Sequence, residues 1–183
     1  MKMLASPGQL RASFIRWALF TVPLCLLLGF LAGQGGGADT AWFRGLEKPA
    51  IYPPAATFPI VWSILYVMIG FALALVCAAR GARLRGMALA VFAVHFALNL
   101  AYTPVFFGAQ EITAALIVLL LVDVTLLAVI ALFWKVRRTA GLLLLPYLAW
   151  VLFATLLNWQ FLQFNPGADG GTGDAAQDRV RIG

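Results

Sequence analysis

The sequence predicts an all-α fold, a bundle of five transmembrane helices with a proline-rich lid loop between the first helix and the second. Hydrophobic residues make up 63% of the 183 residues and charged residues 11%, a composition that excludes an ordinary soluble domain. Five apolar runs reach or approach the roughly 20 residues that a helix needs to cross a bilayer. They lie near residues 17–33, 58–79, 87–107, 112–134 and 140–164. Because the links between them are short, residues 1–164 form one membrane domain.

The first run, residues 17–33, has two interpretations. Arg11 and Arg16, the apolar stretch and the small residues near Gly33 fit a cleaved signal peptide, and cleavage would leave four helices. Gly29 and Gly33 also form a small-xxx-small pair, which is typical of packed membrane helices. This pair favours a retained first helix.

The loop that follows, from Trp42 into the second run, is rich in tryptophan and proline. Proline fixes φ and removes a backbone donor, so this segment is no ordinary helix until after Pro59. The earlier prolines of the loop are Pro49, Pro53 and Pro54. We expect a semi-rigid, partly extended lid that brings Trp42, Tyr52 and Phe58 to one place on the membrane surface.

The second and third runs carry aromatic and polar side chains at helical spacing. In the second run, Phe58, Trp62 and Tyr66 follow one another at steps of four, and therefore share one helix face. The third run has a stripe of small residues, Gly86, Ala90, Ala93, Ala97 and Ala101. This stripe is either a dimer interface or a packing face inside the bundle. A second stripe of His95, Asn99, Tyr102 and Phe106 should point inward, because lipid exposure of these polar groups would be costly.

The fourth run carries Asp123 at its middle, and an acid inside the membrane suggests a functional role. Its alternative is a protonated acid that is bonded to a carbonyl or a hydroxyl group. His95, the only histidine, is either a structural hydrogen-bonding residue or a haem ligand, and a His95–Asp123 pair is within reach. Cys25 and Cys77 lack metal-site spacing and count as small hydrophobic residues, so the sequence predicts no metal site and no cofactor.

The fifth run completes the wall of a predicted cavity. Its inward stripe is Tyr147, Trp150, Ala154, Asn158 and Phe161. At about 1.5 Å per residue, Trp62, Tyr102 and Asn158 lie roughly 6–8 Å deep, Asn99 about 12 Å and Trp150 about 20 Å. Aromatic and amide groups at overlapping depths beneath a lid suit a large, flat, mostly apolar ligand.

The alternative to a cavity is an aromatic belt at the membrane interfaces together with an ordinary core. The belt is the better explanation for Trp17, Trp134 and Trp159, which lie near helix ends. For Trp42, both a belt role and a ligand contact remain open. Asn99 and Asn158 could also bond neighbouring helices.

The positive charges alternate along the chain in a way that argues against nucleic-acid binding. They flank the runs as Lys2, Arg11 and Arg16, then Arg80, Arg83 and Arg85, then Lys135, Arg137 and Arg138. This alternation follows the positive-inside rule and predicts an integral membrane protein, as in a bacterial inner membrane. The amino terminus is then cytoplasmic, while the lid and the carboxyl terminus lie outside. Residues 165–183, rich in Gly, Ala and Asp, are predicted to be a disordered tail.

Three motifs resemble those of the TspO/MBR family, which includes the tryptophan-rich sensory proteins and the translocator proteins. They are W-F-R-G-L-E-K-P-A-I-Y-P-P-A-A-T-F-P-I-V-W-S-I-L-Y at 42–66, N-L-A-Y-T-P-V-F-F at 99–107 and L-L-P-Y-L-A-W-V-L-F-A-T-L-L-N at 144–158. The resemblance implies a five-helix fold, usually dimeric, and a pocket that binds porphyrins, sterols or drug-like ligands. It implies pocket roles for Trp62, Asn99 and Trp150, while Tyr147 and Asn158 line or brace the pocket.

Departures from the family pattern lie in the lid and at the end of the fifth run. Many relatives carry tryptophan where this chain has Ile51 and Ala56, and no basic residue lies between residues 159 and 165, so cholesterol recognition is not supported. The complete predicted ligand-binding set is Trp42, Tyr52, Phe58, Trp62, Tyr66, Asn99, Tyr102, Tyr147, Trp150, Ala154 and Asn158.

Three functions follow from the resemblance. The first is a membrane receptor or sensor that binds protoporphyrin IX, haem-like tetrapyrroles or similar ligands as a homodimer through the third helix. The second is light-dependent porphyrin degradation, in which Trp62 and Trp150 would donate electrons; the sequence contains no hydrolytic triad or nucleotide loop. The third is transport of tetrapyrroles or sterols. The sequence shows no inverted repeat, which argues against transport.

Overall fold

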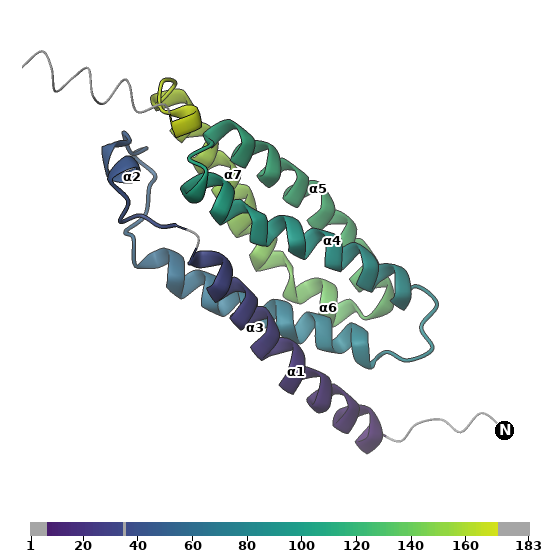
Figure 1. Cartoon of the computed structure of the whole chain (residues 1–183). Coiled ribbons are helices and arrows are strands. Elements are labelled where there is room, and N and C mark those ends of the chain that lie inside the picture. Colours follow the sequence, from purple (N-terminus) through teal and green to yellow (C-terminus); the bar gives the residue numbers. More distant parts are fainter. Residues whose placement is uncertain (1–6, 35, 172–183) are drawn as a thin grey trace, which may run out of the picture.

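The computed structural model describes residues 7–34 and 36–171, and within them it is a bundle of long helices (Figure 1). Among these described residues, five stretches are long and apolar enough to cross a membrane, which confirms the predicted all-α fold with five spans. The elements are α1 (Pro7–Gly33), α2 (Ala41–Gly45), α3 (Thr57–Ala78), α4 (Arg85–Thr103), the π-helical turn η1 (Pro104–Gly108), α5 (Ile112–Val136), α6 (Arg138–Leu143), α7 (Leu145–Phe164) and the 3₁₀ turn η2 (Asp169–Gly171).

Helix α1 begins ten residues before the apolar run that predicted it. It starts at Pro7, so Arg11 and Arg16 lie inside the helix and not before it. Hydropathy marks the part of a helix that lies in lipid, whereas the helix itself continues until a capping or breaking residue ends it. Lys2 lies outside the described residues. Cleavage of this segment stays an untested alternative, although α1 packs into the bundle.

The fifth run is divided into α6 and α7 at Leu144. Pro146 is the second residue of α7 and has no N–H to give to the carbonyl of Leu142, four residues earlier. The third run is divided in the same way, because Pro104 follows α4 and opens the π-helical turn η1. Such turns are frequent at functional sites, and this one lies at the lid end of the bundle (Figure 1).

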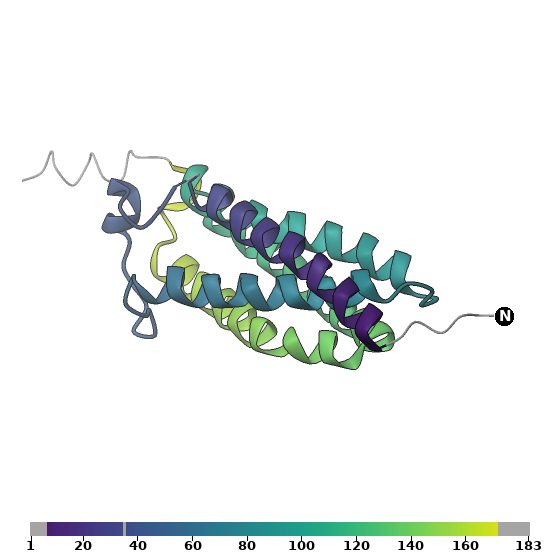
Figure 2. The same ribbon diagram turned by 90° about the horizontal axis from the view of Figure 1, so that it is seen from below.

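Helix α1 lies along α3 at a close backbone approach, as both views of the bundle show (Figures 1 and 2). A Cβ atom added at Gly70 would lie only 2.6 Å from the Cα atom of Val22. The Thr21 hydroxyl donates to the Gly70 carbonyl at 2.8 Å across the same crossing. Glycine is therefore required at this crossing.

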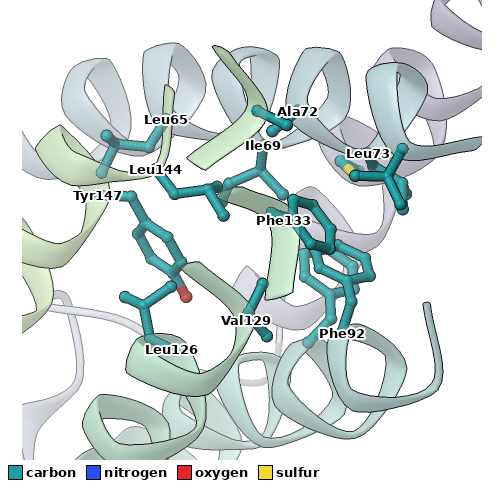
Figure 3. Close-up of a cluster of buried hydrophobic side chains, with 14 of the residues drawn as sticks. Leu65, Ile69, Ala72, Leu73, Phe92, Leu126, Val129, Phe133, Leu144 and Tyr147 are labelled. Carbon is teal, nitrogen blue, oxygen red and sulfur yellow. The ribbon is translucent and has the colours of Figure 1, made fainter. Parts of the chain in front are cut away.

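The main core lies at the centre of the bundle (Figure 3). It joins Leu65 and Ile69 of α3 to Leu126 and Phe133 of α5 and to Tyr147 of α7, all almost fully buried. The outer surface is apolar instead of polar, with Leu19 73% and Val124 67% exposed. A bundle with an apolar exterior is suited to lipid.

The small-residue stripe of α4 lies on this outer surface. Gly86, Ala90, Ala93 and Ala97 are exposed, while His95 and Asn99 on the opposite face are buried. The structure therefore does not support the second alternative for this stripe, packing inside the bundle.

The two ends of the bundle differ in charge. The loops that carry Arg80, Arg83 and Arg137 lie at the end where α1 begins, and Arg85 donates there to the Cys77 carbonyl at the end of α3, at 3.2 Å. The opposite end carries the lid with α2 and the segment that follows α7 (Figure 2).

The segment after α7 corrects part of the predicted disorder. Residues 165–171 form turns and the 3₁₀ turn η2, because the side chains of Asn165 and Asp169 find backbone partners in the lid and in α5. Residues 172–183 lie outside the described residues.

Candidate ligand-binding cavity

A cavity of about 480 Å³ lies beneath the lid, between α1, α3, α4, α5 and α7. This volume is within the roughly 300–1,000 Å³ range of small-molecule sites. The walls are mostly apolar and aromatic. The ring centroids of Trp62 and Tyr66 are stacked 5.3 Å apart, and those of Phe58 and Trp150 lie 5.9 Å apart in an edge-to-face arrangement.

Nine of the eleven residues in the predicted ligand-binding set line this cavity. They are Tyr52, Phe58, Trp62, Tyr66, Asn99, Tyr102, Trp150, Ala154 and Asn158. Helical periodicity predicted those that lie on α3, α4 and α7, because residues three or four apart along a helix face the same side. Tyr52 lies in the loop before α3 and was predicted as part of the proline-rich lid. The other two, Trp42 and Tyr147, lie outside the lining.

Tyr147 supports the cavity wall from behind. Its hydroxyl lies 3.0 Å from Nε2 of His95, and its ring contacts that of Trp62 with centroids 6.1 Å apart. The Thr125 hydroxyl is 2.9 Å from His95 Nδ1, and donates its one hydrogen to the Leu121 carbonyl at 2.7 Å. Thr125 must therefore accept from His95 Nδ1–H, and Tyr147 donates to Nε2.

Both ring nitrogens of His95 are consequently occupied. The structure favours the structural interpretation of this histidine over haem ligation, since neither nitrogen is left to face an iron atom. Within the described residues His95 makes no pair with Asp123.

Asp123 is buried between α5 and α7, next to the cavity wall but outside its lining. Its Oδ2 lies 2.8 Å from the Thr155 hydroxyl, which lies 3.1 Å from the Val151 carbonyl. A neutral Asp123 that donates to Thr155, which in turn donates to Val151, gives each of the two O–H groups an acceptor. Oδ1 of Asp123 has no partner among the described residues.

Trp42 points away from the cavity and toward the chain that follows α7. Its indole N–H donates to the Ala168 carbonyl at 3.1 Å, and its ring packs on Phe106 with centroids 5.6 Å apart. Phe43, which the sequence did not single out, takes the inward position and is only 3% exposed. The short helix α2 turns it inward, and Thr40 caps that helix by accepting from the Phe43 N–H at 3.2 Å.

Other lining residues were also missed. They include Gly29, Asp39, Thr103, Phe106, Phe107, Leu119, Val122 and Phe161. Phe106 and Phe161 lie on stripes that were predicted to face inward. Phe43 could have been found from Thr40, a residue type that favours the start of a helix and so indicates a helical turn inside the lid. Asp39 has no sequence signal of this kind.

Two amides give the cavity its polar character. The Tyr66 hydroxyl donates to Asn99 Oδ1 at 3.2 Å, and the Asn158 amide donates to the Tyr102 hydroxyl at 3.3 Å. Asn158 Oδ1 is buried and has no partner among the described residues. Each amide thus joins neighbouring helices and also lines the cavity, so the two roles considered for these asparagines coexist.

The segment after α7 fastens the lid to the bundle. Asn165 accepts from the Glu47 N–H at 2.8 Å and donates to the Glu47 carbonyl at 3.0 Å. Asp169 accepts from the N–H groups of Ile112, at 2.5 Å, and Thr113, at 3.1 Å, and from the Thr113 hydroxyl. A carboxylate here also complements the positive end of the α5 dipole.

The chemistry of Asp169 agrees with this capping role. Partial burial alone would raise the pKa of the Asp169 carboxyl, but hydrogen bonds from Thr113 and Ile112 outweigh it and hold that pKa below its ordinary value. In the lid itself, burial raises the pKa of the Tyr52 phenol. Tyr52 is therefore neutral and serves as an apolar wall with a hydrogen-bonding tip.

Comparison with known proteins places these features in a family. A model of the TspO/MBR family matches residues 21–164. The chain is 38% identical over 128 residues to protein CrtK of Rhodobacter capsulatus, covering 69% of this chain and 80% of that protein. It is 37% identical over 147 residues to the tryptophan-rich protein TspO of Chlorobaculum tepidum, covering 79% and 93%. The human translocator protein is 36% identical over 144 residues, covering 78% and 83%.

Proposed function

The chain belongs to the TspO/MBR family of membrane proteins, and we propose that it is a receptor or sensor for porphyrins or similar flat, hydrophobic ligands. The observation that carries the proposal is the aromatic cavity beneath the lid, with Trp62, Trp150 and Phe58 on its walls. Aromatic faces favour flat, conjugated rings, and a few amides fix their orientation. The names of its relatives, which include sensory and translocator proteins, agree with a role in ligand recognition.

The proposed assembly is a homodimer in which the small-residue stripe of α4 is the interface. Gly86, Ala90, Ala93 and Ala97 are exposed along one face, where a second copy of the helix could approach closely. The proposed location is a bacterial inner membrane. With the basic end of the bundle in the cytoplasm, the lid faces outside.

A second candidate function is light-dependent degradation of a bound porphyrin. It is favoured by the position of Trp62 and Trp150, which both line the cavity and could both contact an excited ring. In this case the chain supplies two oxidisable side chains, and the photochemistry belongs to the ligand.

The experiment is an absorbance titration of the purified protein with protoporphyrin IX, in darkness and under irradiation. Saturable binding without spectral loss supports a receptor, and irradiation-dependent bleaching that requires Trp62 or Trp150 supports degradation. Trp150→Ala should weaken binding by about 1–3 kcal/mol, because it removes a large stacking surface.

Trp134→Ala is the matched control, since Trp134 lies at the other end of the bundle and does not line the cavity. Equal affinity of the native protein and both folded variants would show that the porphyrin site lies elsewhere. No saturable binding would reject the proposed function.

A further inference from the structure

The cavity has one formally charged side chain among its described lining residues, and that side chain is an acid. Asp39 lies in the loop before α2, is exposed to solvent and lines the cavity. No lysine, arginine or histidine lines the cavity within the part of the chain that the structure describes. The other polar lining groups are neutral and comprise Tyr52, Tyr66, Asn99, Tyr102, Thr103 and Asn158.

The cations of the lid are directed elsewhere. Lys48 donates through its Nζ to the carbonyls of Phe43, Arg44 and Leu46 at 2.7, 3.1 and 2.9 Å. The same ammonium group lies 4.9 Å from the centre of the Phe43 ring, and burial lowers its pKa. Arg44 is exposed and does not line the cavity. Lys48 thus stabilises the backbone of the lid and is not free to pair with a ligand anion.

Asp39 is held at the cavity mouth by the residues on both sides of it. Gly36 has φ +144°, and a Cβ atom there would lie 2.8 Å from Cβ of Phe107, so the loop can press against Phe107 only with glycine at this position. On the other side, Thr40 donates its N–H to the Gly37 carbonyl at 3.3 Å and caps α2. These two anchors fix the path of the loop and hence the place of the Asp39 carboxylate.

On the basis of the proposed function, we infer that the cavity selects its ligand by charge and that Asp39 determines this selection. A flat ligand with a neutral or cationic edge is preferred to one that carries carboxylates. A carboxylate drawn into the cavity would lose its hydration without gaining a cation, and neutral amide and phenol donors offset this loss only in part. A carboxylate left at the mouth would be repelled by Asp39. A porphyrin that carries carboxylates therefore binds with its acidic edge directed away from Asp39 and toward water.

The test compares three porphyrins that differ at the same two side chains. The probes are protoporphyrin IX with two carboxylates, its neutral dimethyl ester, and a diamine analogue with two ammonium groups. Each is titrated against the native full-length chain, Asp39→Asn and the control Glu47→Gln. Glu47 is an exposed acid of the same lid that does not line the cavity. The affinity of each ligand is compared between protein variants and not with that of another ligand. Differences in the solubility of the ligands in detergent therefore do not affect the comparison.

Asp39→Asn is expected to tighten binding of the dicarboxylate about two- to fivefold and to weaken binding of the diamine by a similar factor, because an exposed charge interaction has about this strength. Binding of the neutral ester should not change. Both changes should vanish at 1 M salt, where the Debye length is about 3 Å. The side chain of Asp39 makes no hydrogen bond among the described residues, so Asp39→Asn should fold normally. Asp39→Ser, which removes the same charge with a different side chain, should reproduce its effects.

Three outcomes would overturn the inference. Equal responses of the three ligands to Asp39→Asn would show that the cavity does not select by charge, while the proposed receptor function would stand. The same changes in Glu47→Gln would assign the selection to the overall charge of the outer surface and not to Asp39. If none of the three porphyrins binds the native protein, the proposed function fails, and the charge selection fails with it.

Discussion

Gly70→Ala should destabilise the bundle, because the added methyl group meets backbone and not a flexible side chain. The new Cβ would lie 2.6 Å from Cα and 3.0 Å from N of Val22. Carbon atoms prefer separations of about 3.5–4.0 Å, so α1 and α3 must move apart by roughly 1 Å at this crossing. Overpacking of this kind costs about 1–3 kcal/mol. Lengthening the 2.8 Å hydrogen bond from Thr21 to the Gly70 carbonyl adds at most about 0.5–1.5 kcal/mol, because the Trp17 carbonyl, 2.9 Å from the same hydroxyl, can accept its hydrogen instead.

The measurement is the thermal unfolding midpoint of the purified protein in detergent, where each kcal/mol corresponds to roughly 2–4 °C for a chain of this size. Gly45→Ala is the control, since an added Cβ there meets nothing within 4 Å and Gly45 lies outside the proposed dimer interface. Combining Gly70→Ala with Val22→Ala should not restore stability. The smaller side chain removes the clash with Cγ2 at 2.9 Å, but the backbone of residue 22 still blocks the added methyl group. Equal midpoints for Gly70→Ala and Gly45→Ala would refute the close approach of α1 and α3.

Three further predictions concern assembly, orientation and the lid. Ala97→Leu should lower the dimer fraction measured by light scattering in detergent, because added methyl groups keep α4 helices apart, and an unchanged mass would place the interface elsewhere. Cysteine at Ala55 should react with an impermeant maleimide added outside cells and cysteine at Ala82 should not; the reverse pattern would invert the orientation. Asp169→Ala should lower the unfolding midpoint by the equivalent of about 0.5–2 kcal/mol, the cost of a lost helix cap. Because the pKa of Asp169 is lowered in the folded protein, its stabilising effect is fully present above the ordinary aspartate value of about 3.9 and is lost as the pH falls through the lowered pKa. The difference between Asp169→Ala and the native protein should therefore disappear in acid, and a difference that persists there would contradict the ionic cap.

The membrane helices and most of the cavity wall could be predicted because they depend on periodicity. Once α3 and α7 are helices, Phe58, Trp62 and Tyr66 share one face, and Trp150, Ala154 and Asn158 share another. Helix ends were less predictable. Hydropathy locates the lipid-embedded part of α1, but the helix extends to Pro7, because no residue between Gly8 and Arg16 breaks it.

The lid was predicted less accurately, because its conformation depends on contacts between distant residues. Trp42 is the larger aromatic residue, yet α2 places Phe43 against the cavity and leaves the Trp42 indole to donate to Ala168. That partner is 126 residues away in the sequence, in a segment whose composition suggested disorder. Composition indicates how much apolar surface a segment can bury. Residues 165–171 are held instead by backbone N–H groups that donate to the side chains of Asn165 and Asp169.

Hydrogen bonds between buried polar groups of the bundle keep the cavity open. An aromatic cavity inside a membrane gains contacts if its walls collapse on one another, so something must hold the rings apart. Tyr147 fixes the back of Trp62 and is itself held by His95, whose other nitrogen is bonded to Thr125 of α5. Tyr66 is held in the same way by its hydrogen bond to Asn99 of α4. Each bond joins two different helices, and breaking it would leave a polar group unpaired in an apolar environment, which costs about 1–3 kcal/mol. Collapse would have to break these bonds, so the network of His95, Asn99 and Tyr147 shapes the site even though two of the three residues do not line it.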